Sequence, residues 1–173
     1  AYPEGVTSHR LKREIVATAL TNAVVNRAGP ATPIAIAEET GRTTADVALA
    51  YRGVEQAFGL EKLWNRLEAL DGHVGGALYL SLEQDVRRVL VYEMRQVASD
   101  QKMFLDFDSA FATLKANVER LQSSMGAILT DKMRSDSSRK ISAMTSAGIP
   151  ADVARDVVSL TLIADAPRIN HLA

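Results

Sequence analysis

The fold is decided by residues 11–30, LKREIVATALTNAVVNRAGP, and residues 37–70, AEETGRTTADVALAYRGVEQAFGLEKLWNRLEAL. In the first stretch apolar and small residues recur at steps of three and four, which is the spacing of an α-helix with one buried face. Ser8 is placed to cap this helix, and the Ala-Gly-Pro sequence at 28–30 ends it. We therefore expect a first helix over about 8–28.

The second stretch contains signals for short helices that meet at abrupt corners. Gly41 supplies the left-handed residue that closes a short helix, and Thr43 then caps the next one, with Asp46 three residues on. Gly59 stops that helix, and the leucine spacing over 60–70 continues as a fourth one. Helices up to Leu70 are thus predicted to be short.

Two longer amphipathic runs follow the glycine-rich residues 72–76. The first covers about 76–100 and the second about 107–128, and the break between them is short enough for an antiparallel hairpin. Residues 130–140 are rich in Ser, Asp and Arg, which favours a frayed helix or a loop. We take the hairpin as the centre of a second structural unit.

A stop-and-restart signal, Gly-Ile-Pro at 148–150, precedes a last helix over about 150–164. No segment alternates as a strand does, so the fold class is all-α: an irregular array of about eight helices with a long antiparallel helical hairpin. We divide the chain into a short-helix unit at 1–72, which contains a helix-turn-helix-like corner, and a unit at 73–173 with the hairpin and the C-terminal helices. One continuous domain is the alternative.

Composition bounds the class of protein. Hydrophobic residues make up 47% of the 173, which is ample for a packed core. The net charge of −1 offers no general attraction for nucleic acid or anionic lipid, and the absence of cysteine fits a reducing compartment. Without a signal peptide or a long apolar run, we expect a cytoplasmic location and no membrane partner. The start at Ala1-Tyr2-Pro3, which lacks methionine, predicts a fragment of a longer protein.

A helix-turn-helix is indicated by the spacing of Ala37, Gly41 and Val47: a small residue, a turn glycine and a locking aliphatic residue. A DNA-reading helix also needs exposed basic groups, whereas this one sets Arg52 against acidic residues, of which Glu55 is one. We therefore interpret the corner as a packing device. A DNA-binding module remains the alternative, and nucleic acid is not an expected partner.

No catalytic, cofactor or metal residue is predicted. The glycines at 72–76 follow a helix and not a strand, so we interpret them as a connector and not as a phosphate cradle. The three histidines, His9, His73 and His171, are too far apart in sequence to pair as metal ligands. The acidic pairs at 38–39 and 106–108 fit a solvated surface or helix caps.

Three polar residues of the first helix are the only candidate site. Asn22 and Asn26 lie one helical turn apart, and Arg27 follows. One interpretation is a buried hydrogen-bonding ladder that fixes the packing of the first helix on the third. The other is an interface with another domain, since amides and guanidinium groups suit a contact that is only partly dry. Both can hold together.

In their order and spacing these motifs resemble the helical C-terminal region of the large bacterial NAD-specific glutamate dehydrogenases. The resemblance is densest over residues 11–71 and weak over 100–145. The segments that carry it are Asn22 to Gly29, Glu39 to Gly41, Asp46-Val47, Ala50-Tyr51 to Val54, Phe58-Gly59-Leu60, Leu63-Trp64, Glu68 to Asp71, Gly148-Ile149-Pro150 and Ala154-Arg155. Gly75-Gly76 departs from the family, which more often has a proline-containing turn there.

The resemblance implies a parent enzyme that oxidatively deaminates L-glutamate to 2-oxoglutarate while reducing NAD, in a long cytoplasmic and oligomeric polypeptide. The lysine and aspartate of that reaction belong to an upstream catalytic domain, and no position here matches them. The resemblance therefore implies that this segment binds no NAD, is inactive alone, and serves structural, assembly or regulatory roles. Its implied partners are the catalytic domain of the same polypeptide and further subunits of a homo-oligomer.

Overall fold

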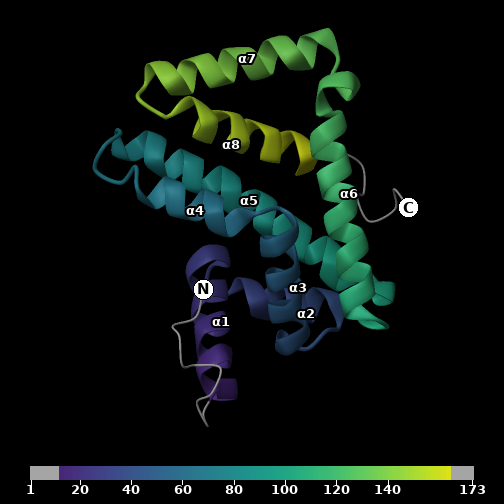
Figure 1. The fold of residues 1–173 in the computed structure, drawn as a ribbon. Coiled ribbons are helices and arrows are strands. Elements are labelled where there is room, and N and C mark those ends of the chain that lie inside the picture. Colours follow the sequence, from purple (N-terminus) through teal and green to yellow (C-terminus); the bar gives the residue numbers. More distant parts are fainter. Residues whose placement is uncertain (1–11, 165–173) are drawn as a thin grey trace.

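The computed structural model describes the backbone of residues 12–164 and the side chains of residues 16–164. Within that range it contains eight α-helices, one 3-10 helix and no strand, which confirms the all-α prediction (Figure 1). The elements are α1 (Lys12–Ala28), α2 (Thr32–Thr40), α3 (Thr44–Ala57), α4 (Leu60–Glu68), α5 (Gly76–Ser99), η2 (Gln101–Phe104), α6 (Phe107–Ile128), α7 (Asp131–Ser146) and α8 (Ala151–Ala164). None of these helices is both long and apolar enough to cross a bilayer.

The corners of the first four helices form where the sequence predicts them. Gly41 and Gly59 have φ of 69° and 64°, the left-handed conformation that glycine adopts without a Cβ clash. Thr43 Oγ1 accepts from the Asp46 amide at 3.1 Å, and Asp46 Oδ2 accepts from the Thr43 amide at 3.1 Å. This reciprocal capping box fixes the start of α3. The predicted cap Ser8 lies outside the described residues.

Helix α3 is the centre of the molecule. It contacts α1, α2, α4, α5 and α6, and most of its inward positions carry small or β-branched residues. Its buried residues are Val47, Ala50, Tyr51, Gly53, Val54 and Ala57. Small side chains let neighbouring helices approach closely, so five elements can share one central helix.

Helix α5 packs on α3 and on α8, with α2 along its second half. The antiparallel hairpin predicted for 76–128 is not confirmed, because α6 leaves the end of α5 at a steep angle and packs on α3 and α8 instead (Figure 1). Gly53 of α3 explains this direction: a Cβ there would lie 3.3 Å from Phe111 and 3.4 Å from Phe107 of α6. The missing side chain makes room for these two rings.

The antiparallel pair in this half of the chain is α7 with α8 (Figure 1). Residues 131–146, of which the first part was predicted as a frayed helix or loop, form a regular helix that begins after Thr130, whose Oγ1 accepts from the Met133 amide at 3.3 Å. Gly148, with φ of 95°, ends the turn, and α8 starts at Ala151 as predicted. Helix α7 has no buried residue.

Buried side chains from both predicted units join in one core cluster, which runs from Val24 of α1 to Ile163 of α8. Helix α5, the first helix of the second unit, contacts α3 of the first unit and α8 of its own, and it contributes to the core along most of its length. The division at residue 72 into two separate folding units stays a prediction.

Candidate functional site

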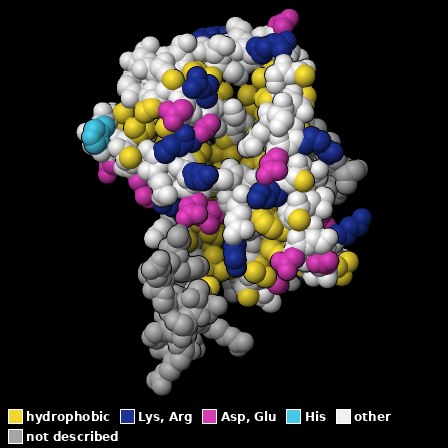
Figure 2. All heavy atoms as spheres, in the orientation of Figure 1, with side chains coloured by type: hydrophobic (Ala, Val, Ile, Leu, Met, Phe, Trp, Pro, Cys, Tyr) yellow, Lys and Arg dark blue, Asp and Glu magenta, His cyan; other side chains and the backbone are white. Residues whose placement is uncertain are grey.

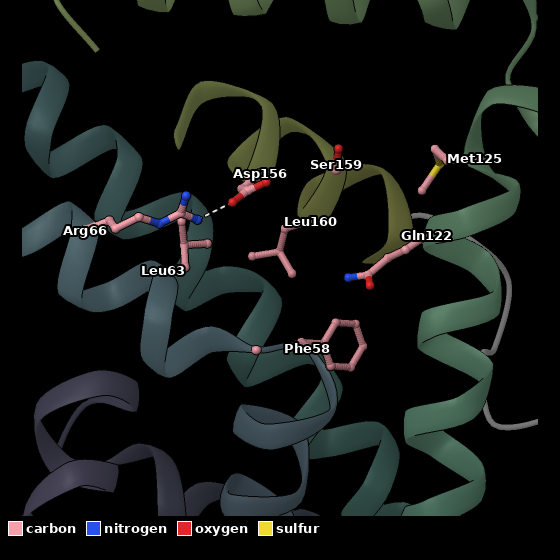
Figure 3. A pocket seen from close by; sticks show the side chains of 9 residues that line it. Phe58, Leu63, Arg66, Gln122, Met125, Asp156, Ser159 and Leu160 are labelled. Carbon is pink, nitrogen blue, oxygen red and sulfur yellow. Dashed lines mark hydrogen bonds and ion pairs between the residues drawn. The ribbon is translucent and has the colours of Figure 1, made fainter. Parts of the chain in front are cut away.

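A cleft of about 350 Å³ lies between α4, α6 and α8, and we call it the Arg66 cleft (Figure 3). Apolar side chains form its floor, while Arg66, Gln122, Asp156 and Ser159 supply its polar groups. The residues that line it are Phe58, Gly59, Leu63, Arg66, Gln122, Met125, Asp156, Ser159 and Leu160. Figure 3 shows Arg66 and Asp156 at one end and the α6 residues Gln122 and Met125 at the other.

Arg66 is held at the cleft edge by the amphipathic pattern of α4, which buries Leu63 and Leu67 and leaves Arg66 partly exposed. Its Nη1 donates to Asp152 Oδ2 at 3.1 Å, and its Nη2 donates to Asp156 Oδ2. Both carboxylates come from the first half of α8, so this pair of contacts ties α4 to α8.

Electrostatics in the Arg66 cleft follow from these contacts. The hydrogen bond to Asp156 raises the pKa of Arg66, so the guanidinium stays charged. The backbone amide of Val153 and then the Arg66 guanidinium lower the pKa of Asp152. Two carboxylates against one guanidinium leave this group with one negative charge, while Arg66 Nε is buried without a hydrogen-bond partner. The cleft offers hydrogen-bonding groups and no general base paired with a nucleophile.

The three candidate residues of α1 do not share one environment in the structure. Asn22 and Asn26 are both exposed, and their side-chain amides make no hydrogen bond within the described residues. The prediction of a buried hydrogen-bonding ladder between the first and third helices is therefore wrong. Arg27 turns inward: its guanidinium lies 4.8 Å from the centroid of the Trp64 ring and pairs with Glu68.

The end of α1 is closed by a residue that the sequence did not mark. Arg87 of α5 donates from Nε to the Arg27 carbonyl at 2.9 Å and from Nη2 to the Asn26 carbonyl at 3.3 Å. These are carbonyls of the last helical turn, which have no partner inside the helix. Arg27 and Arg87 therefore anchor α1, and the two asparagines remain on its outer face.

The predicted helix-turn-helix corner exists as a shape. Val47 is fully buried against its neighbours, and Gly41 makes the turn. Arg42 fixes the corner to α5, because its Nε donates to the Ala98 carbonyl at 3.1 Å and its guanidinium lies 4.1 Å from the Phe104 ring centroid. Helix α3 packs against five other helices, and its one basic residue is Arg52, so it lacks the basic face that a recognition helix needs. The DNA-binding alternative therefore finds no support.

The remaining sequence features have local roles. Residues 72–76 connect α4 to α5, and Gly72 has φ of 73°. His73 is exposed, and its Nδ1 lies 3.1 Å from the Asp71 carbonyl; His9 and His171 lie outside the described residues. No group of three His, Cys, Asp or Glu side chains that could hold a metal ion occurs in the part of the chain that the structure describes.

Sequence reasoning missed two functional candidates. The Arg66 contacts join residues that are 86 and 90 positions apart, and nothing in a single sequence marks such a pairing. Glu93 of α5 is only 3% exposed, and burial raises its pKa to about 7. The signal for Glu93 was present, since a charged residue stood within an apolar stripe of the 76–100 run.

The many-helix array packed around one central helix, with a small charged cleft between α4, α6 and α8, defines an all-α domain. The comparisons with known proteins identify its family. A family model described as glutamate dehydrogenase, C-terminal, matches residues 1–173. The chain belongs to this family.

Curated relatives show the same likeness. The chain is 29% identical over 158 residues to the NAD-specific glutamate dehydrogenase of Halomonas elongata, covering 91% of this chain and 10% of that protein. It is 29% identical over 149 residues to the enzyme of the same name from Mycobacterium tuberculosis, covering 86% and 9%, and 28% identical over 156 residues to that of Pseudomonas aeruginosa, covering 90% and 10%. The chain thus spans about a tenth of the length of these relatives. No solved structure matches it.

Proposed function

We propose that this chain is a non-catalytic helical segment of an NAD-dependent glutamate dehydrogenase, where it serves structural, assembly or regulatory roles. The parent reaction converts L-glutamate, NAD and water to 2-oxoglutarate, ammonium and NADH, in the cytoplasm. One observation carries the proposal: the chain is similar over about nine tenths of its own length to only about a tenth of three NAD-specific glutamate dehydrogenases. The segment is a small part of a much longer enzyme.

The chemistry belongs to the remainder of that enzyme. A dinucleotide fold needs a strand that leads through a glycine-rich turn to a helix amino terminus, and the glycines at 72–76 connect two helices. The Arg66 guanidinium is neutralised by carboxylates of its own chain, and no other cleft group is paired for proton transfer. NAD is therefore the cofactor of the parent, and this segment is inactive alone and does not hold NAD.

The partners are the catalytic domain of the same polypeptide and other subunits of a homo-oligomer. The face of α1 that carries Asn22 and Asn26 supports one such interface, because both amides are exposed without a partner in the described part of the chain. Arg27 positions this face by its contacts with Trp64 and Glu68.

The test compares two versions of the full-length polypeptide: one intact and one that lacks residues 12–164. Glutamate-dependent NADH production is measured for both, and light scattering gives the size of each assembly. We expect the intact polypeptide to turn over glutamate and the deletion to lose activity or assembly. An intact polypeptide that is inactive on glutamate overturns the identification, and a deletion with full activity, assembly and regulation overturns the proposed role.

A further inference from the structure

The turn between α5 and α6 carries an apolar side chain, Leu105, that is almost fully exposed. We define the aromatic corner as Phe104, Leu105, Phe107 and Phe111, which follow the end of α5 through η2 into α6. Leu105 is 85% exposed, more than any other large hydrophobic residue whose exposure the structure describes. The three phenylalanines are partly buried, so Leu105 extends a half-exposed aromatic surface, and apolar patches of this kind are a common feature of interaction sites.

The aromatic rings pack against one another and against neighbouring elements. Phe104 and Phe107 have ring centroids 5.8 Å apart, and Phe107 and Phe111 stack at 6.2 Å with an interplanar angle of 4°. Phe107 and Phe111 rest on Gly53 of α3, while Arg42 covers one face of Phe104. A surface already ordered before binding loses little conformational freedom when a partner arrives.

A hollow of about 360 Å³ lies beside the aromatic corner. Phe104 and Leu105 form one wall, and the turn at 40–42 and the end of α5 form the others. A projecting leucine next to a hollow provides both halves of an interlocking contact: a knob for the partner and a socket for one of its side chains.

The surroundings of the aromatic corner are acidic. Asp100, Asp106 and Asp108 outnumber the one base, Lys102, within residues 100–108, so this segment carries a net charge of −2; Arg42, over Phe104, is a further cation beside it. Figure 2 shows hydrophobic and acidic side chains next to one another at the lower end of α6. A partner surface that is apolar at its centre and basic at its edge complements this pattern.

The length of the curated relatives indicates which partner covers the aromatic corner. Because this chain spans about a tenth of each curated relative, about nine tenths of such a polypeptide lies outside it, tethered at high effective concentration. A symmetric contact with a second copy would instead set one acidic segment against its own like, which is repulsive. We propose that the aromatic corner docks onto a basic-edged apolar surface in the remainder of the same polypeptide. This inference rests on the proposed function and names a docking surface for it.

A photo-crosslinking experiment on the full-length polypeptide tests the proposal. Leu105→p-benzoylphenylalanine places the probe at the aromatic corner, and Ile128→p-benzoylphenylalanine, at the opposite end of α6, is the matched control because Ile128 is also exposed, at 58%. We expect Leu105 to cross-link to peptides from outside residues 1–173, with a yield several-fold above that of Ile128. Cross-links only within residues 1–173 of a second copy, equal yields at both positions, or no cross-link at Leu105 overturn it.

Hydrogen exchange gives a second readout that does not depend on the probe. Leu105→Asp removes an exposed side chain and adds a like charge to the acidic segment, so the fold of the segment is not affected, whereas docking weakens. Amides 104–111 of the full-length polypeptide are expected to exchange several-fold faster in Leu105→Asp and to be unchanged in Ile128→Asp. Unchanged exchange in Leu105→Asp contradicts docking.

The two proposals fail separately. If the unsubstituted polypeptide reduces NAD with glutamate and Leu105 gives no cross-link, docking at the aromatic corner is wrong and the function stands. If Leu105 cross-links as expected but the polypeptide does not use glutamate, the function is wrong and the docking surface stands.

Discussion

Helices α3 and α7 begin alike and end up in opposite environments. Each starts after a threonine cap, Thr43 for α3 and Thr130 for α7, and they have 14 and 16 residues. Six residues of α3 are buried, whereas α7 has none. A cap sets where a helix begins, whereas the side chains of its inner face decide whether other helices gather around it.

The largest expected effect tests the central position of α3. Tyr51 is 1% exposed, and its hydroxyl donates to Glu55 Oε1 at 2.6 Å. We expect Tyr51→Ala to lower the free energy of unfolding by about 3–5 kcal/mol, because it leaves a large cavity on the buried side of α3, the helix that five others contact. Urea denaturation of residues 1–173, followed by circular dichroism, measures the loss.

The matched change in α7 is Ile141→Ala. Ile141 is partly buried and packs on the core from the side of α8. Since α7 contacts essentially one neighbour, we expect a loss of about 1 kcal/mol. If the two variants are equally destabilised, α3 is not the structural centre and the comparison fails.

Glu93 provides the second test of the contrast between the buried centre and α7. Its carboxylate is buried in the centre of the molecule, whereas the carboxylates of Asp131 and Asp136 of α7 reach solvent. Its pKa in the folded state, about 7, lies above the ordinary value of 4.5, so the folded state binds this proton more tightly than the unfolded state. The contribution of Glu93 to stability is therefore greatest below pH 4.5 and falls by roughly 3 kcal/mol as the pH rises to 7.

Glu93→Gln mimics the protonated side chain and should remove this pH dependence. Unfolding free energies of the wild type and the variant are measured between pH 5 and pH 8. We expect them to converge at pH 5 and the variant to be more stable at pH 8, while Asp136→Asn leaves the slope of the wild type unchanged. A wild type as stable at pH 8 as at pH 5 would show that Glu93 is solvated or paired.

The smallest expected effect separates the two caps. Thr43 takes part in a reciprocal capping box, and Thr130 makes a single bond to the Met133 amide. Thr43→Ala is expected to cost about 1–2 kcal/mol of global stability, because α3 must be intact for its neighbours to pack.

Thr130→Ala is expected to cost less than about 0.5 kcal/mol globally and instead to speed hydrogen exchange in the first turn of α7. A global loss equal to that of Thr43→Ala would mean that α7 is coupled to the core despite its exposed surface.

Local signals account for what the sequence predicted well. Gly41, Gly59 and the Thr43–Asp46 box act through their immediate neighbours, so their effects can be foreseen without knowing the tertiary structure. The polar composition of 131–140 concealed a regular helix, because the Thr130 cap and two ion pairs spaced i to i+3, Arg134–Asp131 and Arg139–Asp136, stabilise α7 although none of its residues is fully buried.

Contacts between residues far apart in the chain could not be predicted from the sequence. The apolar stripes of 76–100 and 107–128 showed which faces are buried, but not that the second helix would pack on Gly53 and α8 and not along the first. For the same reason the asparagines of α1 were assigned a buried role, although Arg27 and Arg87 make the anchoring contacts. The site at Arg66 depends on α8, which lies about half the chain away.

The contacts of Arg66 also set an order of folding. Helices α1 to α5 gather around α3 with partners close in sequence, so this part of the chain can collapse while later residues are still being synthesised. Asp152 and Asp156, which are 86 and 90 residues further on, close the longest loop among the side-chain bonds described. Closing a long loop late costs chain entropy that only the docking of α8 repays. We therefore expect the contact between α4 and α8 to form late in folding.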